Sequence, residues 1–318
     1  MAQARTTMFA VASAALLAGA VLTGCGGSPA QAGCSGSDLP TVAGAPGTDP
    51  VISVPNGSPG GALRVCTLAA GAGPVVGHND FVVFHVEGKV WAGDREVVDS
   101  YTNQQPQGLA LSTAMPAWRQ LAGQRIGSRV LMVVPPKDGF GTQGDPQANI
   151  MGSDTLVFVF DLLGTVGDRT TASGTTQPYH PTAGQPTVRD GSAGPTITVP
   201  GKATPPAALT TTVLRRGNGR PITNGQTVIV QYTGVVWRTG KVFDSSWARG
   251  FPEAFQLGAG QVLAGWEQGL GGRTVGSRLL LTVPPALGYG TQGDAPDVQA
   301  DDTLVFVIDI VDAVTAPR

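Results

Sequence analysis

The chain has 318 residues, with 20 Lys or Arg against 22 Asp or Glu, so its formal net charge at pH 7 is −2. Charged residues make up only 13% of it, whereas glycine and proline are abundant, with 46 and 25 copies. The near-neutral charge and the lack of basic blocks or zinc-finger and RNP-like spacings exclude a nucleic-acid partner, and the length predicts about two domains.

The first residues read as a targeting signal. Arg5 supplies a positive start, an apolar run extends from Met8 to Leu22, and the run ends in the box LTGC, residues 22–25. The run is too short for a membrane-spanning helix. The box resembles the signal of bacterial lipoproteins, so we expect a signal peptide over 1–24, lipid-modified Cys25, a tether over 25–38, and a location outside the cytoplasm, anchored to the cell membrane. The alternative is an ordinary secretory signal with a chance cysteine.

Two further cysteines remain, Cys34 and Cys66. In an oxidising compartment an even remainder favours a disulfide, which would stabilise such a loop by about 3–4 kcal/mol. Two unpaired thiols are the alternative.

From Leu39 onward the chain repeats itself. GTQGD occurs at 141–145 and again at 290–294, DTLVFV occurs at 154–159 and 302–307, and IGSR at 126–129 returns as VGSR at 275–278. The repeat predicts two copies of one domain, over 39–166 and 185–318, joined by a linker over 167–184. Each copy opens with a Pro-rich preface, 39–61 or 185–206, which we expect to add an edge strand.

The second copy contains the most informative stretch, residues 227–309. TVIVQYTG, KVFDSS, LLLTVPP and TLVFVIDIV have the composition of strands, whereas QVLAGWEQGL places its apolar residues at helical spacing. We therefore expect a sheet curled round one short helix, with Trp266 facing the concave side. Tyr232, Phe243, Tyr289 and Phe306 each come from a different element, as the wall of an apolar pocket requires.

The order YTG, FDSS, GWE-x-G, VG-x-R, YG and TLVFVID resembles the FKBP family of peptidyl-prolyl cis-trans isomerases. The resemblance implies an α+β fold with two tandem FKBP-like domains, each a curled antiparallel sheet wrapped round one short helix. It also implies site roles: Trp266 as the floor, Tyr232, Phe243 and Phe306 as the walls, Val262 and Leu263 as the lip, Val298 as a further apolar contact, and Tyr289 with the Leu263 N–H as donors to the substrate carbonyl. Asp244 is expected to join Tyr232 and Arg249 in one hydrogen-bonded cluster.

The chemistry of this reaction needs no nucleophile, cofactor or metal. Rotation about an X–Pro bond is opposed by about 18–20 kcal/mol because twisting destroys amide resonance. An apolar pocket disfavours the planar, strongly dipolar ground state, and a donor aimed at the carbonyl stabilises the twisted one. The three histidines, His78, His85 and His180, lack ligand spacing, and the aspartates of 294–302 do not follow an EF-hand pattern.

The two copies differ at the expected pocket positions. At the corresponding places of the repeat, the first copy has Val86, Val98, Asp99, Gln104, Trp118, Phe140 and Phe158 where the second has Tyr232, Phe243, Asp244, Arg249, Trp266, Tyr289 and Phe306. We therefore expect a degenerate pocket in the first domain and catalysis in the second. Asp99, without its partners, is expected to face solvent or to cap the adjacent turn.

Glu253 departs from the family pattern, which has a Phe at that place, and Phe251 is the candidate to compensate. Two functions from different classes follow. The first is a prolyl isomerase that acts on Pro-containing segments of exported proteins, with a macrolide as a further candidate ligand. The second is a non-catalytic peptide-binding protein or chaperone that uses the same fold.

Overall fold

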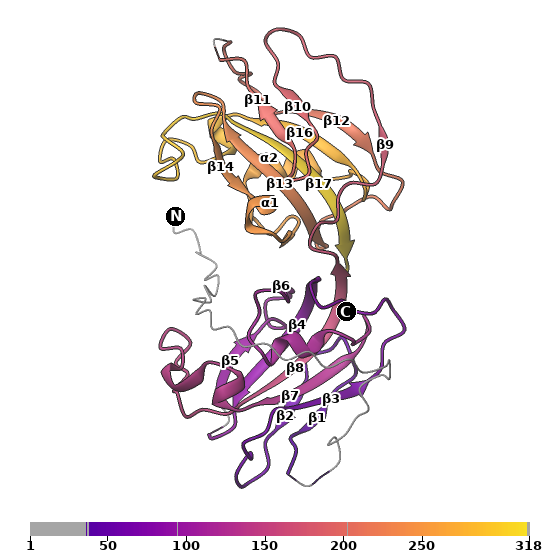
Figure 1. Cartoon of the computed structure of the whole chain (residues 1–318), viewed down its shortest axis with the longest axis vertical. Helices are drawn as coiled ribbons and strands as arrows, with labels where there is room; N and C mark the ends of the chain where they lie inside the picture. Colours follow the sequence, from indigo (N-terminus) through magenta and orange to yellow (C-terminus); the bar gives the residue numbers. More distant parts are fainter. Residues whose placement is uncertain (1–35, 37, 94, 202, 317–318) are drawn as a thin grey trace.

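The computed structural model describes residue 36 and residues 38–93, 95–201 and 203–316. Each half of this part of the chain forms one large antiparallel sheet and a small two-stranded one, and the two large sheets occupy opposite ends of the molecule (Figure 1). The expected signal peptide, Cys25 and Cys34 lie outside the described residues. Within the described part, no helix is long and apolar enough to cross a membrane.

The N-terminal sheet has six strands in the order β3-β7-β8-β4-β5, with β6 also paired to β4. Its elements are β3 (Arg64–Ala69), β4 (Phe81–Val90), β5 (Glu96–Asp99), β6 (Gln107–Ala110), the 3-10 helices η1 (Trp118–Leu121), η2 (Pro136–Asp138) and η3 (Gly141–Gln143), and the strands β7 (Arg129–Val134) and β8 (Leu156–Val166).

The C-terminal sheet has seven strands in the order β14-β13-β17-β16-β12-β9, with β15 paired to β13. Its elements are β9 (Thr175–Thr176), β12 (Thr210–Arg216), β13 (Thr227–Val236), β14 (Val242–Ser245), α1 (Ser246–Arg249), β15 (Glu253–Gln256), α2 (Ala264–Leu270), β16 (Arg278–Val283), η4 (Pro285–Leu287) and β17 (Leu304–Val314). The α+β fold with two similar domains is confirmed, and α2 is the helix predicted from QVLAGWEQGL.

The helix α2 lies close against the sheet because two glycines face the strand β16. A Cβ on Gly269 would lie 2.5 Å from Leu281, and one on Gly265 would lie 2.5 Å from Val283. The next residue, Trp266, is only 5% exposed and belongs to the concave-side core. In the first copy a single 3-10 turn, η1, replaces α2, so the predicted short helix is shorter there.

The Pro-rich prefaces do not add an edge strand to either sheet, so that prediction is wrong. Each forms a separate two-stranded hairpin, β1 (Thr41–Ala43) with β2 (Val51–Ser53), and β10 (Thr187–Arg189) with β11 (Thr196–Thr198). The alternating pattern is real, but its apolar side chains pack on the convex face of the sheet, where Ile52 and Ile197 are buried. The hairpins therefore bury the second face of each sheet.

Each hairpin is tied to its domain through a buried ion pair. Arg129 donates two hydrogen bonds to Asp161, at 2.6 and 2.7 Å, and further ones to carbonyls of the first preface. In the second copy Arg278 pairs with Asp309 and also reaches Asp190 of the second preface. Because a buried charge is costly unless it is fully paired, these residues fix where each hairpin lies.

Part of the segment predicted as a linker is packed on the second domain. It contains β9, which pairs with β12, and its Ala172 is buried and donates its N–H to Asp309 at 3.1 Å. The low periodicity of this segment reflects an irregular path along the sheet edge.

The two domains meet in a small apolar cluster. Phe81, Val83 and Ala110 of the first domain contact Ile229 and Val314 of the second, and Phe251 and Ala254 pack against them. Gln256 of β15 also donates a hydrogen bond to the Gln104 carbonyl at 2.9 Å. The loop and strand next to the C-terminal pocket therefore rest on the first domain.

Cys66 is disulfide-bonded and almost fully buried under the first hairpin. Its partner lies outside the described residues, so the pairing with Cys34 stays a prediction.

Candidate active site

Five aromatic residues of the second domain form one continuous group. Edge-to-face contacts join Tyr232 to Trp266 and Trp266 to Phe306, with ring centroids 4.9 and 5.2 Å apart. Phe243 continues the group, 5.6 Å from Phe306 and 6.5 Å from Tyr289. These rings come from β13, α2, β17, β14 and the loop after η4, so the fold brings together the aromatic residues predicted from the sequence.

The group is graded from a buried floor to an accessible rim. Trp266, Tyr232 and Phe306 are at most 6% exposed, whereas Phe243 and Tyr289 are half-buried. The Nε1–H of Trp266 has no hydrogen-bond partner among the described residues. An apolar ring bound at the rim would therefore rest on an aromatic surface that carries few polar groups.

Gly234 allows two of these rings to approach the sheet. A Cβ on this residue would lie 2.8 Å from Phe306 and 3.0 Å from Phe243. The strand register shifts after Gly234, so that Phe243 has no partner on β13. This irregularity places the Phe243 ring next to Gly234. The glycine of the YTG motif is thus required by packing, because its φ is not in the left-handed region.

The predicted polar cluster is present beside the aromatic group. The carboxylate of Asp244 accepts hydrogen bonds from the Tyr232 hydroxyl and from Arg249, and Arg249 also donates to the Tyr232 oxygen at 3.1 Å. Burial, and then the adjacent Asp244 carboxylate, raise the pKa of Tyr232. The phenol therefore stays protonated, and the carboxylate is fully paired.

Glu253 joins this cluster instead of lining the apolar wall. It accepts a hydrogen bond from Arg249 at 3.0 Å, and burial raises the pKa of its carboxyl although Arg249 opposes the shift. Phe251 does not compensate as expected, because it belongs to the interface between the domains. Its ring lies 6.0 Å from the Arg249 guanidinium carbon.

Tyr289 lies at the rim, in the loop that follows η4. Burial, and then the carboxylates of Asp294 and Asp244, raise the pKa of its phenol to about 12. The hydroxyl is therefore a hydrogen-bond donor at every physiological pH.

The lip expected at Val262 and Leu263 is half-buried and packs against the same core. Glu267 holds the loop before it, since its carboxylate accepts the N–H groups of Gly258 at 2.6 Å and Gly260 at 3.1 Å. Within the described residues the Leu263 N–H makes no hydrogen bond, while its carbonyl accepts the Trp266 N–H. Val298, only 3% exposed, packs into the core at the base of the next loop.

Sequence reasoning missed two residues of this site. Phe255 of β15 contacts Trp266, with ring centroids 5.8 Å apart, and Glu267 fixes the lip loop. A sequence signal for Phe255 was available, because residues 253–256 have the alternating composition of a short strand. The Glu that follows Trp266, one turn from a Gly-rich loop, was a signal for the second.

Strand pairing corrects the comparison between the two copies by one residue. Gly234 lies opposite Asp244 and Thr233 opposite Ser245, whereas the matching Gly88 and Glu87 lie opposite Val98 and Asp99. Asp99 is therefore the counterpart of Ser245, and Val97, Val98 and Asn103 occupy the places of Phe243, Asp244 and Arg249. Among the described residues of the first copy, no carboxylate occupies the place of Asp244.

Asp99 caps the adjacent turn, which is one of the two roles predicted for it. It accepts the N–H of Tyr101 at 2.6 Å and of Thr102 at 3.2 Å, much as the Ser245 hydroxyl accepts the Ala248 N–H and caps α1. In the first pocket Trp118 is half-buried, edge-on to Phe158 and Phe160 at 5.4 and 5.5 Å. Val86 and Phe140, at the places of Tyr232 and Tyr289, belong to the same apolar cluster as Trp118, and neither side chain carries a hydroxyl.

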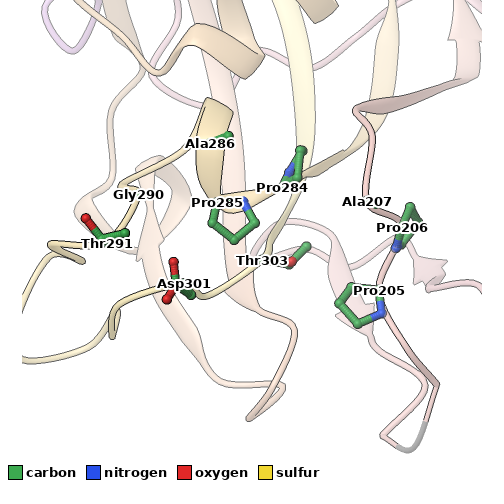
Figure 2. A pocket seen from close by; sticks show the side chains of 10 residues that line it. All are labelled: Pro205, Pro206, Ala207, Pro284, Pro285, Ala286, Gly290, Thr291, Asp301 and Thr303. Carbon is green, nitrogen blue, oxygen red and sulfur yellow. The ribbon is translucent and has the colours of Figure 1, made fainter.

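A separate hollow of about 530 Å³ lies beyond the end of β16 (Figure 2). It is lined largely by prolines and small residues, Pro205, Pro206, Pro284 and Pro285 among them, and by Asp301 and Thr303. None of the five aromatic residues lines it, so it is distinct from the aromatic group.

Comparison with known proteins identifies the family of both domains. A family profile described as FKBP-type peptidyl-prolyl cis-trans isomerase matches residues 73–163 and 218–311, more than half of the chain. The "FK506-binding protein" of Streptomyces anulatus is 46% identical over 118 residues, 37% of this chain and 94% of that protein.

Two yeast relatives are matched over about two thirds of their own length. The "FK506-binding protein 2" of Candida glabrata is 47% identical over 88 residues, 28% of this chain and 65% of its own. The "Peptidyl-prolyl cis-trans isomerase FPR2" of Saccharomyces cerevisiae is 44% identical over 92 residues, 29% of this chain and 68% of its own. A solved structure described as "Crystal structure of AtFKBP13" is 31% identical, covers 34% of this chain and 94% of its own, and gives a TM-score of 0.32.

Proposed function

Because the chain belongs to the FKBP-type peptidyl-prolyl cis-trans isomerase family, we propose that its C-terminal domain catalyses the isomerisation of X–Pro bonds at the aromatic group around Trp266. The observation that carries this proposal is the coexistence of an apolar aromatic floor with two hydrogen-bond donors at its rim, Tyr289 Oη and the Leu263 N–H. The N-terminal domain keeps the floor but lacks the first donor.

The reaction is a rotation, so catalysis consists in binding the twisted amide better than the planar one. The proline ring packs against Trp266, Phe243 and Phe306, where water is excluded and the large dipole of the planar amide is poorly solvated. Twisting localises the carbonyl charge, and the Tyr289 hydroxyl and the Leu263 N–H stabilise it. The residues preceding the proline then lie over the lip at Val262.

The polar cluster positions the walls in this proposal. Asp244 holds Tyr232 through its hydroxyl, and Arg249 closes the cluster. Because Arg249 also pairs with Glu253, both carboxylates beside the pocket have a cationic partner. A macrolide of the kind named in the relatives would compete with peptide for the same floor.

For the N-terminal domain we propose peptide binding without efficient catalysis. Half-buried Trp118 presents an apolar surface bordered by Val86 and Phe140, which provides contact area for an extended segment but no hydroxyl donor. The substrates of the chain would be Pro-containing segments of exported proteins. This rests on the proposal that the mature chain is a lipoprotein outside the cytoplasm, anchored through Cys25, which is supported by the LTGC box and is consistent with the disulfide at Cys66.

The division of labour can be tested in the full chain by giving the second pocket the residues of the first. The variant Tyr232→Val, Phe243→Val, Tyr289→Phe carries the side chains that the first copy holds at those places within the same fold. Isomerase activity towards an Ala-Leu-Pro-Phe peptide should fall to a few per cent or less, with folding checked by circular dichroism. The control, Trp118→Phe in the first domain, should leave activity unchanged. The proposal fails if the triple variant folds and retains most of its activity.

A further inference from the structure

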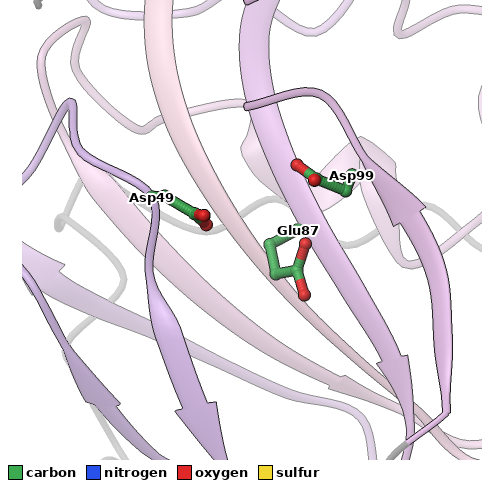
Figure 3. Close-up of side chains that lie close together, drawn as sticks. All are labelled: Asp49, Glu87 and Asp99. Carbon is green, nitrogen blue, oxygen red and sulfur yellow. The ribbon is translucent and has the colours of Figure 1, made fainter. Parts of the chain in front are cut away.

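Three carboxylates from distant parts of the N-terminal domain meet on the convex side of its sheet. One oxygen each of Asp49, Glu87 and Asp99 lies within 4.8 Å of the others. Asp49 comes from the β1–β2 loop of the preface, Glu87 from β4 and Asp99 from the end of β5. Asp49 and Asp99 reach towards Glu87 from either side (Figure 3).

Glu87 is the anomalous member of this group. Its side chain is 5% exposed, and no hydrogen bond or ion pair connects its carboxylate to any of the described residues. Buried carboxylates are normally paired, because an uncompensated charge is costly to bury. Burial, and then the neighbouring Glu96 and Asp99, raise the pKa of Glu87 to about 8, with only Lys89 opposing them.

The second domain provides an internal comparison. The residues equivalent to Glu87 and Asp99 are Thr233 and Ser245, whose hydroxyl oxygens lie 3.4 Å apart across the same strand pair. The place of Asp49 is taken by Gly194, and the Trp247 ring packs against it. A neutral hydroxyl pair in one copy is thus replaced in the other by two carboxyl groups directly opposite each other, an arrangement that destabilises a sheet when both groups are ionised.

We propose that Asp49, Glu87 and Asp99 bind a Ca²⁺ ion, which joins the preface hairpin to the sheet. Hard divalent cations prefer carboxylate oxygens, and ligands placed 2.3–2.6 Å from Ca²⁺ lie at most about 5 Å apart, which suits the observed spacing. Asp99 is held in place as a ligand, because its carboxylate accepts the Tyr101 N–H at 2.6 Å and the Thr102 N–H at 3.2 Å. Exposed Asp49 closes the site from the solvent side, and water would complete the coordination.

With three carboxylates and several waters, the dissociation constant should be on the order of 0.1–1 mM. The test is thermal unfolding of the full chain in chelated buffer with CaCl₂, or with NaCl at equal ionic strength. Ten millimolar CaCl₂ should raise the Tm of the N-terminal domain by about 5 °C. Glu87→Gln and Asp49→Asn should abolish the shift. The matched control Glu96→Gln removes an exposed charge from β5, the strand that carries Asp99, and should keep the shift because Glu96 is not one of the three ligands.

Glu87→Gln should itself raise the Tm without calcium, which shows that this variant folds. Three outcomes would overturn the proposal. The first is no Tm shift of the wild type with CaCl₂. The second is an equal shift with NaCl, which would be charge screening. The third is a shift that survives in Glu87→Gln or is lost equally in Glu96→Gln. In each case Glu87 is a neutral buried acid and no cation joins the hairpin to the sheet.

Discussion

Replacing Tyr289 by Phe isolates one donor of the proposed pocket. The phenol is half-buried at the rim, and its pKa of about 12 keeps it a donor throughout the physiological range. In the free protein the hydroxyl interacts with the nearby Asp294, so a substrate carbonyl replaces an existing partner. The net contribution should therefore be close to that of one ordinary hydrogen bond, about 1–2 kcal/mol, or roughly 5–30-fold in kcat/KM.

The assay is cis/trans exchange of an Ala-Leu-Pro-Phe peptide, measured by NMR line shapes so that no coupling protease is needed. Removal of one hydroxyl should lower kcat more than it raises KM, because the bond strengthens as the amide twists. The control is Phe140→Tyr at the equivalent place in the first domain, which should leave the rate unchanged. A Tyr289→Phe variant with full kcat/KM would show that the hydroxyl is not used, and a rate gain from Phe140→Tyr would contradict the division of labour.

Three further predictions concern packing, protonation and anchoring. Gly234→Ala should lower the Tm of its domain by roughly 5–10 °C and reduce activity. Gly88→Ala, whose Cβ would lie 2.7 Å from Phe158, should destabilise the first domain and leave activity intact. Equal activity in the two variants would argue against the C-terminal pocket. The kcat/KM should be flat between about pH 6 and 9, because the raised pKa values of Tyr232 and Tyr289 keep both phenols protonated there; a bell-shaped profile would require a different acid or base. Cys25→Ser should move the chain from the membrane fraction to the soluble fraction, and a variant that still pellets with membranes would refute the lipid anchor.

The sequence predicts the second domain well because each of its pocket residues lies in a local pattern. Trp266 sits in a helical repeat, Tyr232 and Phe306 alternate within strands, and Tyr289 lies in a Gly-rich loop, so each element could be recognised separately. The arrangement of the prefaces could not be predicted in this way. Whether a short alternating strand pairs with an edge or packs on a face depends on its tertiary partners, here the buried Arg129–Asp161 and Arg278–Asp309 pairs.

The one-residue error in matching the copies has a physical origin. The motifs VDS at 98–100 and FDS at 243–245 look equivalent, but equivalence in a sheet is decided by the residue across the strand. A register shift follows Gly88 and Gly234 alike, so the backbone of the two copies is the same while the sequence motif has slipped by one position. The carboxylate that faces the pocket in one copy consequently faces the opposite side of the sheet in the other.

This slip accounts for why one sheet supports two different polar centres. In the C-terminal domain Asp244 lies on the concave side, where Tyr232 and Arg249 satisfy it. In the N-terminal domain the neighbouring position carries the acid, so Asp99 turns to the convex side, next to Glu87 and the preface loop. Because the concave and convex cores are separate clusters in both domains, a change in one face leaves the packing of the other intact. The N-terminal copy could therefore lose the pocket cluster without losing the fold, and its convex face became free to acquire the carboxylates that we propose bind calcium.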